Sequence, residues 1–210
     1  MKKLVLKTAL ITFIAACVVL LSLFGIMSLA APVAMMNITA SLGLGGMSSD
    51  YAYEAYGRNE EIGYLARAAE VAYANGNYKK ADDRFKELIA HQSFKEYCES
   101  RDRDAGAFEG AHTAGTYRAY IYSSASCAKY HLAETKEEKS ETINFAIDNT
   151  EKNFPEYNAV IALAVEARRA ENAEFCGMLK EALKDAVDRG RFDGDNTDLN
   201  NGIKFLEDFE

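Results

Sequence analysis

The chain has 210 residues, a formal net charge of −8, four cysteines, two prolines and no tryptophan. Its acidic balance argues against a nucleic-acid-binding protein, which needs clustered lysine and arginine to displace counterions from phosphates, and four cysteines are too few for a disulfide-stapled scaffold. About half of the residues are apolar although the mean hydropathy is slightly negative, which predicts one apolar and one polar segment.

The N-terminal part of the chain has the composition of a membrane-spanning helix. Residues 8–49 contain no charged side chain, and residues 8–36 are almost entirely apolar or small. About 20 helical residues cross a hydrocarbon core of ~30 Å, so residues 8–36 are long enough to serve as a transmembrane helix. Three lysines precede this segment: Lys2, Lys3 and Lys7. Because no basic residue follows until Arg58, the positive-inside bias predicts residues 1–7 in the cytoplasm and the remainder outside the cytoplasmic membrane.

Two alternatives compete for the same segment. Ser28-Leu29-Ala30 offers the small residues that signal peptidase requires, and cleavage near Ala30 would give a secreted protein. The apolar run is longer than a usual signal core, which favours an uncleaved anchor. Residues 14–17 (IAAC) also resemble a lipoprotein cleavage box with Cys17 as the acylated residue, but the apolar run continues beyond it. The intact mass of the purified protein separates the three cases.

Residues 37–49 (NITASLGLGGMSS) are rich in glycine and serine. This composition predicts a flexible linker with a root-mean-square reach of roughly 20 Å. Asn37-Ile38-Thr39 matches a glycosylation acceptor, which matters only in a host that glycosylates exported asparagine. The linker is expected to lead into one helical domain, residues 50–210.

Apolar residues recur at steps of three and four through most of residues 50–210, which predicts helices. The apolar stripes fall within residues 62–72, 78–89, 117–132, 143–147, 157–165, 175–186 and 199–206. Short polar or glycine-containing breaks separate them, as between antiparallel helices, and residues 101–115 form the longest interruption, expected as a loop or an irregular helix. No run alternates as a strand would. The sequence therefore predicts an all-α fold: a transmembrane helix followed by stacked helical hairpins over residues 59–92, 115–150 and 155–188.

The first of these hairpins carries a recognisable pattern. Residues 76–85 (GNYKKADDRF) resemble the turn and second helix of a tetratricopeptide repeat, a 34-residue helix–turn–helix whose stacked copies form protein-binding superhelices. Ala69 and Ala81 match the two positions where small side chains let the helices approach closely, and Gly76 stands in the turn. Phe85 matches the aromatic residue that packs into the neighbouring helix, and Tyr78 the one that packs across the turn.

The resemblance covers residues 59–92 well and the remainder weakly. Three positions depart from the family pattern: Ala68, Ala72 and Ser93 stand where leucine, tyrosine and proline are usual. About three repeats are needed to bury a continuous core, and the three expected hairpins supply that number. The resemblance implies a protein-interaction module, and a simple helical bundle is the alternative.

No complete catalytic or metal-binding motif is present. The Glu109–His112 pair has the spacing used in di-iron proteins, but such sites need this motif twice, and His131 with Glu134 is interpreted as a surface pair. Residues 193–198 are acidic like a calcium loop, but the sixth and twelfth positions counted from Asp193, which need glycine and glutamate, hold Asp198 and Lys204. Three cysteines are expected as small buried residues: Cys98, Cys127 and Cys176. The sequence therefore predicts no enzyme, no cofactor and no metal.

Tyrosines are concentrated in and before the first hairpin: Tyr51, Tyr53, Tyr56, Tyr64 and Tyr73. Tyrosine combines apolar area with a hydroxyl group and is enriched at protein interfaces. These five residues are the candidates for a partner-binding surface. The alternative is that residues 51–56 form a helix that caps the stack.

Together these features predict a membrane-anchored, extracytoplasmic protein-interaction module or scaffold. Its layout resembles that of bacterial envelope proteins with one anchor and a repeat domain, including ancillary translocon subunits. Without the three N-terminal lysines, 21 basic and 32 acidic residues leave the remainder with a net charge of −11, which favours a protein partner with a basic surface. The alternatives are a self-associating structural envelope protein and an enzyme with an unrecognised site.

Overall fold

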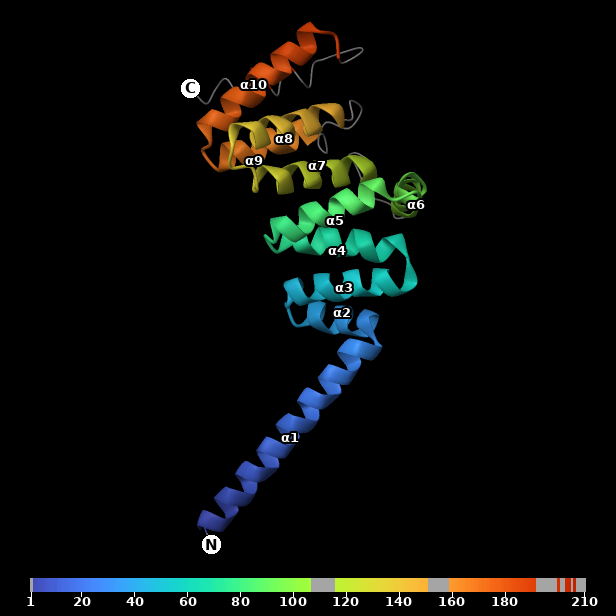
Figure 1. Cartoon of the computed structure of the whole chain (residues 1–210), viewed down its shortest axis with the longest axis vertical. Helices are drawn as coiled ribbons and strands as arrows, with labels where there is room; N and C mark the ends of the chain where they lie inside the picture. The colour runs from blue at the N-terminus through green and yellow to red at the C-terminus, as the bar shows by residue number, and fades with distance from the viewer. Residues whose placement is uncertain are drawn as a thin grey trace.

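The computed structural model describes residues 2–106, 116–150, 159–191, 200, 203, 204 and 206. These residues form helices and connecting turns without a strand, which confirms the prediction of an all-α fold. The helices are α1 (Lys2–Ala30), α2 (Pro32–Ser41), α3 (Gly45–Asn59), α4 (Ile62–Ala74), α5 (Tyr78–Ala90), α6 (Phe94–Gly106), α7 (Tyr117–Tyr130), α8 (Lys136–Asp148), α9 (Ala159–Arg169) and α10 (Ala173–Asp188). Figure 1 shows α1 projecting from one end of a stack formed by the others.

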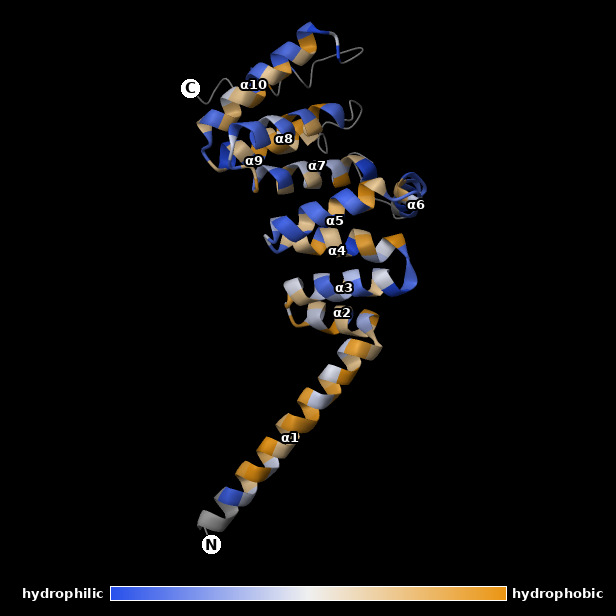
Figure 2. Cartoon of the chain, viewed as in Figure 1, coloured by the Kyte–Doolittle hydropathy of each residue, from blue (hydrophilic) through white to orange (hydrophobic). Residues whose placement is uncertain are grey.

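Helix α1 is long and apolar enough to cross a membrane. The apolar part, Lys7–Ala30, has 24 residues, and the chain buries none of its most apolar stretch; Figure 2 shows this helix as mainly hydrophobic. The helix ends at Ala30, six residues before the predicted boundary at residue 36, because Pro32 starts a new helix. A residue before proline is disfavoured in the helical conformation, and Ala31 accordingly leaves it, with φ −141° and ψ 66°.

The predicted flexible linker is wrong, because residues 37–49 form the end of α2, a tight turn and the start of α3. Gly43 supplies the positive φ of 72° that this turn needs. Gly45 lies where any Cβ atom would clash with the Asn75 amide, so it permits close approach of the α4 end. Buried Ser49 donates a 2.7 Å hydrogen bond to the Ala68 carbonyl of α4. The small residues here serve helix packing rather than flexibility.

Helices α4 and α5 form a tight antiparallel pair around the turn at residues 75–77. Gly76 adopts φ 71°, which a side chain would strain, and the Asn77 side chain caps α5 by accepting a hydrogen bond from the Lys80 amide. Alternating small and large side chains fill the contact between the helices. Ala69, Ala81 and Phe85 are completely buried there.

Helix α6 occupies part of the segment expected as an interruption. It continues to Gly106, whereas residues 107–115, including Glu109 and His112, lie outside the described residues. Helix α7 follows and is the central helix of the stack, since residues 121–128 are all buried. It packs against α5 and α6 on the N-terminal side and against α8 and α9 on the C-terminal side.

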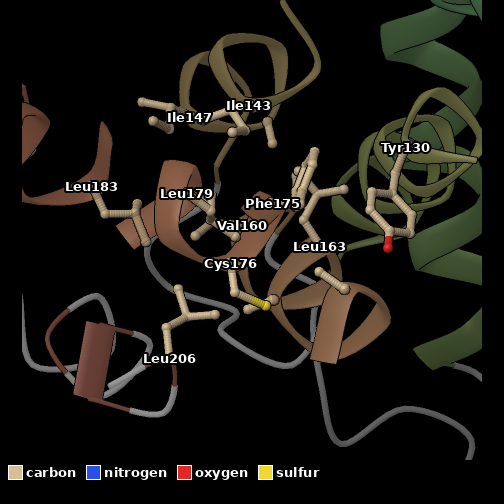
Figure 3. Packing of buried hydrophobic residues seen from close by; sticks show 14 of the residues in the cluster. Tyr130, Ile143, Ile147, Val160, Leu163, Phe175, Cys176, Leu179, Leu183 and Leu206 are labelled. Atoms are coloured by element: carbon tan, nitrogen blue, oxygen red, sulfur yellow. The ribbon is translucent and has the colours of Figure 1, made fainter. Parts of the chain in front are cut away.

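Two apolar cores meet at α7. The first combines α4, α5, α6 and one side of α7, and the second combines the other side of α7 with α8, α9 and α10. Figure 3 shows the second core, in which Phe175 of α10 and Tyr130 of α7 converge; their ring centroids lie 4.7 Å apart. Leu206, near the C-terminus, also packs into this core. The predicted final helix, residues 199–206, lies mostly outside the described residues.

Candidate functional site

A groove of about 520 Å³ opens where α5 and α8 both approach the C-terminal end of α7. Its lining residues come from these three helices and from the turn after α7: Lys79, Asp82, Lys86, Lys129, Leu132, Ala133, Glu138, Glu141, Thr142 and Phe145. Phe145 of its lining packs against the first core, so apolar packing helps to position the helices that carry its polar side chains. No periodicity or motif in the sequence indicates this groove.

A buried carboxylate forms the floor of the groove. Asp82 of α5 is buried, and its Oδ2 atom lies 2.5 Å from the Lys86 ammonium. Its Oδ1 atom lies 3.1 Å from the Lys129 ammonium of α7 but accepts no hydrogen bond of good geometry from the described residues. Because this oxygen is itself buried, Asp82 acts by fixing the Lys86 and Lys129 ammonium groups at the groove.

The two walls of the groove carry opposite charges. Lys79 and Lys86 of α5 have exposed ammonium groups, and Glu141 and Glu138 of α8 are exposed on the other side. Glu138 also closes the capping box at the start of α8. Backbone hydrogen bonds from Thr135 and Glu134 hold the pKa of the Glu138 carboxyl below its ordinary value. The groove is therefore suited to a polar segment that carries both signs of charge.

Aromatic contacts lock the turn of the α4–α5 pair onto α7. The ring of Tyr78 stacks on the ring of His131, with centroids 3.8 Å apart and planes 11° apart. The His131 Nε2 atom lies 2.9 Å from a carboxylate oxygen of Glu166 in α9. Tyr78, one of the predicted repeat residues, thus contacts the end of α7 beside the groove.

The three tyrosines of α3 face different neighbours. The Tyr51 hydroxyl lies 2.7 Å from the Ser28 hydroxyl of α1, whereas Tyr53 donates a 2.8 Å hydrogen bond to Glu87 of α5. Tyr56 packs beside Tyr53, with ring centroids 6.2 Å apart. These side chains join α3 to α1 and α5. Because α3 packs between α2 and α4, it lies inside the stack and does not form the terminal cap that the sequence offered as the alternative.

The two tyrosines of α4 lie elsewhere. Tyr64 is half-buried, and Tyr73 packs against both apolar cores. None of the five candidate tyrosines lines the groove. The structure thus places them at different contacts rather than on one surface, and their role in partner binding stays a prediction.

Cys127, His131 and Glu166 come closest to a nucleophilic constellation. Cys127 and His131 are one helical turn apart on α7, and Glu166 contacts the imidazole. Burial raises the pKa of the Cys127 thiol to about 12, so the thiolate needed for nucleophilic attack is scarce at neutral pH. Among the described residues, no group of three or more potential ligands could hold a metal ion.

The buried thiols are expected to react very slowly in the folded protein. No disulfide joins the four cysteines, and Cys98, Cys127 and Cys176 are all buried. Raising the pKa of Cys127 from 9.0 to about 12 lowers its thiolate fraction near neutral pH by about a thousandfold. Alkylation with iodoacetamide followed by peptide mass spectrometry should modify Cys127 only after denaturation. Rapid modification of Cys127 in the native protein would contradict this assignment.

Glu70 is expected to make stability depend on pH. Burial raises the pKa of its carboxyl above the ordinary 4.5, although the Tyr117 hydroxyl donates a hydrogen bond to it and Arg101 and Arg67 lie near. The folded state therefore binds the proton more tightly than the unfolded state, and this group loses stabilisation as pH rises through the interval above 4.5.

Glu70→Gln removes this titration and keeps an oxygen that can accept from Tyr117. We expect the variant to gain stability relative to the native chain at neutral pH and to lose this advantage near pH 4.5. Urea unfolding at both pH values measures the difference, with exposed Glu96→Gln as the control for the lost charge. If the difference in unfolding free energy between the native chain and the variant were the same at both pH values, the raised pKa of Glu70 would be contradicted.

Comparisons with protein-family models, with curated proteins and with solved structures find no match to this chain. The resemblance to a tetratricopeptide repeat accordingly depends on the residues of α4 and α5 alone.

Proposed function

We propose that this protein is a membrane-anchored interaction module that binds a segment of a partner protein in the groove between α5, α7 and α8. The observation that carries the proposal is the open, polar groove, whose Lys86 and Lys129 are held by the buried Asp82 in its floor. A preformed concavity lined by a few fixed polar groups is the usual form of a recognition site. Helix α1 supplies the anchor.

A repeat-like arrangement supports this proposal. The pairs α4–α5, α7–α8 and α9–α10 are hairpin neighbours, and the first helix of each pair contacts the first helix of the next. The α2–α3 pair precedes them and α6 is inserted. In such stacks each pair covers the apolar face of its neighbour and leaves continuous surfaces for a partner. We therefore interpret the stack as similar to tetratricopeptide repeats.

The proposed partner lies on the side of the membrane opposite the N-terminal lysines. Those lysines favour a cytoplasmic N-terminus, so the stack is proposed to lie outside the cytoplasmic membrane. The net charge of −11 beyond the anchor lysines favours a partner with a basic surface. Because the two walls of the groove differ in sign, we expect the bound segment to carry both acidic and basic side chains.

The test is cross-linking combined with a charge exchange across the groove. A photo-cross-linking amino acid at Ala133, in the groove lining, is expected to capture a partner from native membranes. The double variant Lys79→Glu/Glu141→Lys exchanges one charge on each wall without changing the net charge, and we expect it to reduce that adduct strongly. The matched control Lys95→Glu/Glu181→Lys makes the same exchange on the exposed surfaces of α6 and α10.

The two double variants separate the role of the groove from a general charge effect. Equal loss of the adduct in both variants would show that the groove walls do not select the partner. An adduct formed only with a second copy of the chain would replace the proposal with self-association. The same experiment with the cross-linker at Lys95 supplies the background.

A further inference from the structure

Large hydrophobic side chains are exposed in only one region of the described stack. This region is its first layer, where Ile38 is 40% exposed, Leu42 67%, Leu44 45% and Met47 39%. From residue 54 onward, every large hydrophobic side chain that the structure describes is less exposed. We call these four residues of α2, the following turn and α3 the apolar foot. Tyr53 of α3, at 39%, is the one further large hydrophobic side chain exposed to this degree among the described residues beyond α1.

The apolar foot continues the exposed apolar surface of α1 without a spacer. The 24 residues Lys7–Ala30 extend about 36 Å, slightly more than a hydrocarbon core of ~30 Å, so a membrane surface falls near Ala30. Only Ala31 separates α1 from α2. Its amide donates to the Met27 carbonyl at 2.9 Å, and its carbonyl accepts from the Met35 amide at 3.1 Å. Helix α2 therefore begins at the membrane surface.

Side-chain contacts hold α2 and α3 at that level. The Tyr51 hydroxyl of α3 lies 2.7 Å from the Ser28 hydroxyl, near the end of α1, and α2 packs against both α1 and α3. Figure 1 shows the α2–α3 pair directly at the end of α1, with the remaining helices beyond it. Tyrosine is enriched at membrane–water interfaces, which fits the position of Tyr51.

Charge supports the same placement. Residues 31–49 contain no charged side chain, so the uncharged segment extends 19 residues past α1. The first charged residue after α1 is Asp50, and its carboxylate is paired with Lys80 and Arg84. A water-exposed surface layer ordinarily carries charged residues, whereas an uncharged surface with exposed Leu and Ile is suited to acyl chains.

We propose that the apolar foot inserts into the membrane leaflet at the C-terminal end of α1 and fixes the orientation of the stack on the bilayer. The inference rests on the proposed anchoring by α1. Because the foot is uncharged, its insertion depends on the acyl chains and not on anionic headgroups. The stack then projects from the membrane, and its groove stays at a fixed distance from the bilayer surface.

The absence of native tryptophan permits a direct test with single-tryptophan variants of the full chain in phosphatidylcholine vesicles. In Leu42→Trp, the tryptophan is expected to show blue-shifted emission and strong quenching by lipids brominated near the headgroup. In Leu20→Trp, within α1, we expect strongest quenching by lipids brominated near the acyl-chain ends. In Lys95→Trp, on exposed α6, emission should be water-like and unquenched. Adding phosphatidylglycerol should leave the Leu42→Trp result unchanged.

Three other outcomes would contradict either the insertion of the apolar foot or the anchoring by α1. If Leu42→Trp behaves like Lys95→Trp while Leu20→Trp is quenched, the anchor holds but the foot lies in water, and the inference fails. If Leu42→Trp is blue-shifted but not quenched by lipid, a protein surface covers the foot, and the inference fails. If Leu20→Trp is not quenched, the anchoring in the proposed function fails instead.

Discussion

Phe85→Ala is expected to lower the free energy of unfolding by about 3–5 kcal/mol. The Phe85 side chain is completely buried in the first core, and its ring packs edge-to-face against Tyr73 with centroids 6.4 Å apart. Alanine would leave a cavity between α4 and α5, and the helices cannot close it because Ala69 and Ala81 already bring their backbones together. Urea unfolding of the full chain in mild detergent, followed by circular dichroism, measures the loss.

Two control variants make the Phe85 prediction specific. Phe85→Leu keeps most of the apolar volume and is expected to cost about 1 kcal/mol. Phe24→Ala removes an exposed ring of α1 and should not change the unfolding of the stack. If Phe85→Ala cost no more than Phe85→Leu, the contact between α4 and α5 would not be the close-packed one described above.

Arg84→Ala is expected to destabilise the stack by about 2 kcal/mol, less than the 3–5 kcal/mol typical of breaking a fully buried ion pair because its partner is half exposed. The Arg84 side chain is buried, with its guanidinium 2.8 Å from Asp50 and 4.8 Å from the centroid of the Tyr53 ring. It also donates a hydrogen bond to the Ser49 hydroxyl. One side chain thereby joins α3 to α5.

Lys80→Ala is the matched control, because Lys80 pairs with the same carboxylate at 2.7 Å but, unlike Arg84, is about half exposed. An exposed pair contributes less than about 1 kcal/mol, so the Arg84 variant should be clearly less stable. Burial acts to raise the pKa of the Asp50 carboxyl, but hydrogen bonds from Lys80 and Arg84 outweigh it and lower the pKa below the ordinary 3.8. The stabilisation from Asp50 is therefore present above pH 3.8 and lost as pH falls below it. Equal losses in both variants would contradict this ranking.

Local sequence patterns were sufficient to predict the helices whose apolar stripe is continuous. The stripes at residues 62–72 and 78–89 correspond to α4 and α5, and the break at Gly76 falls in the turn between them. These features depend on interactions within three or four residues, or on the conformational freedom of one glycine. The apolar character of α1 is also a property of its own residues.

The same patterns could not identify the α2–α3 pair. Glycine and serine at residues 43–49 are compatible with a flexible linker and equally with closely packed helices. Contacts with α4 and its C-terminal end distinguish the two cases. The Ser49 hydroxyl donates to the Ala68 carbonyl, and Gly45 lies against the Asn75 side chain. Such contacts appear only once the chain is folded.

The candidate site depends on tertiary structure to a greater degree. Asp82 and Lys129 are 47 positions apart in the sequence, and Lys129 lies in a different helical pair. No periodicity relates them, so composition and spacing gave no indication of their ion pair or of the groove above it. By itself the sequence determined an all-α chain with one apolar helix and a charge-free segment beside it. Only packing around α7 decided which polar side chains meet, because burial and charge pairing act between distant segments.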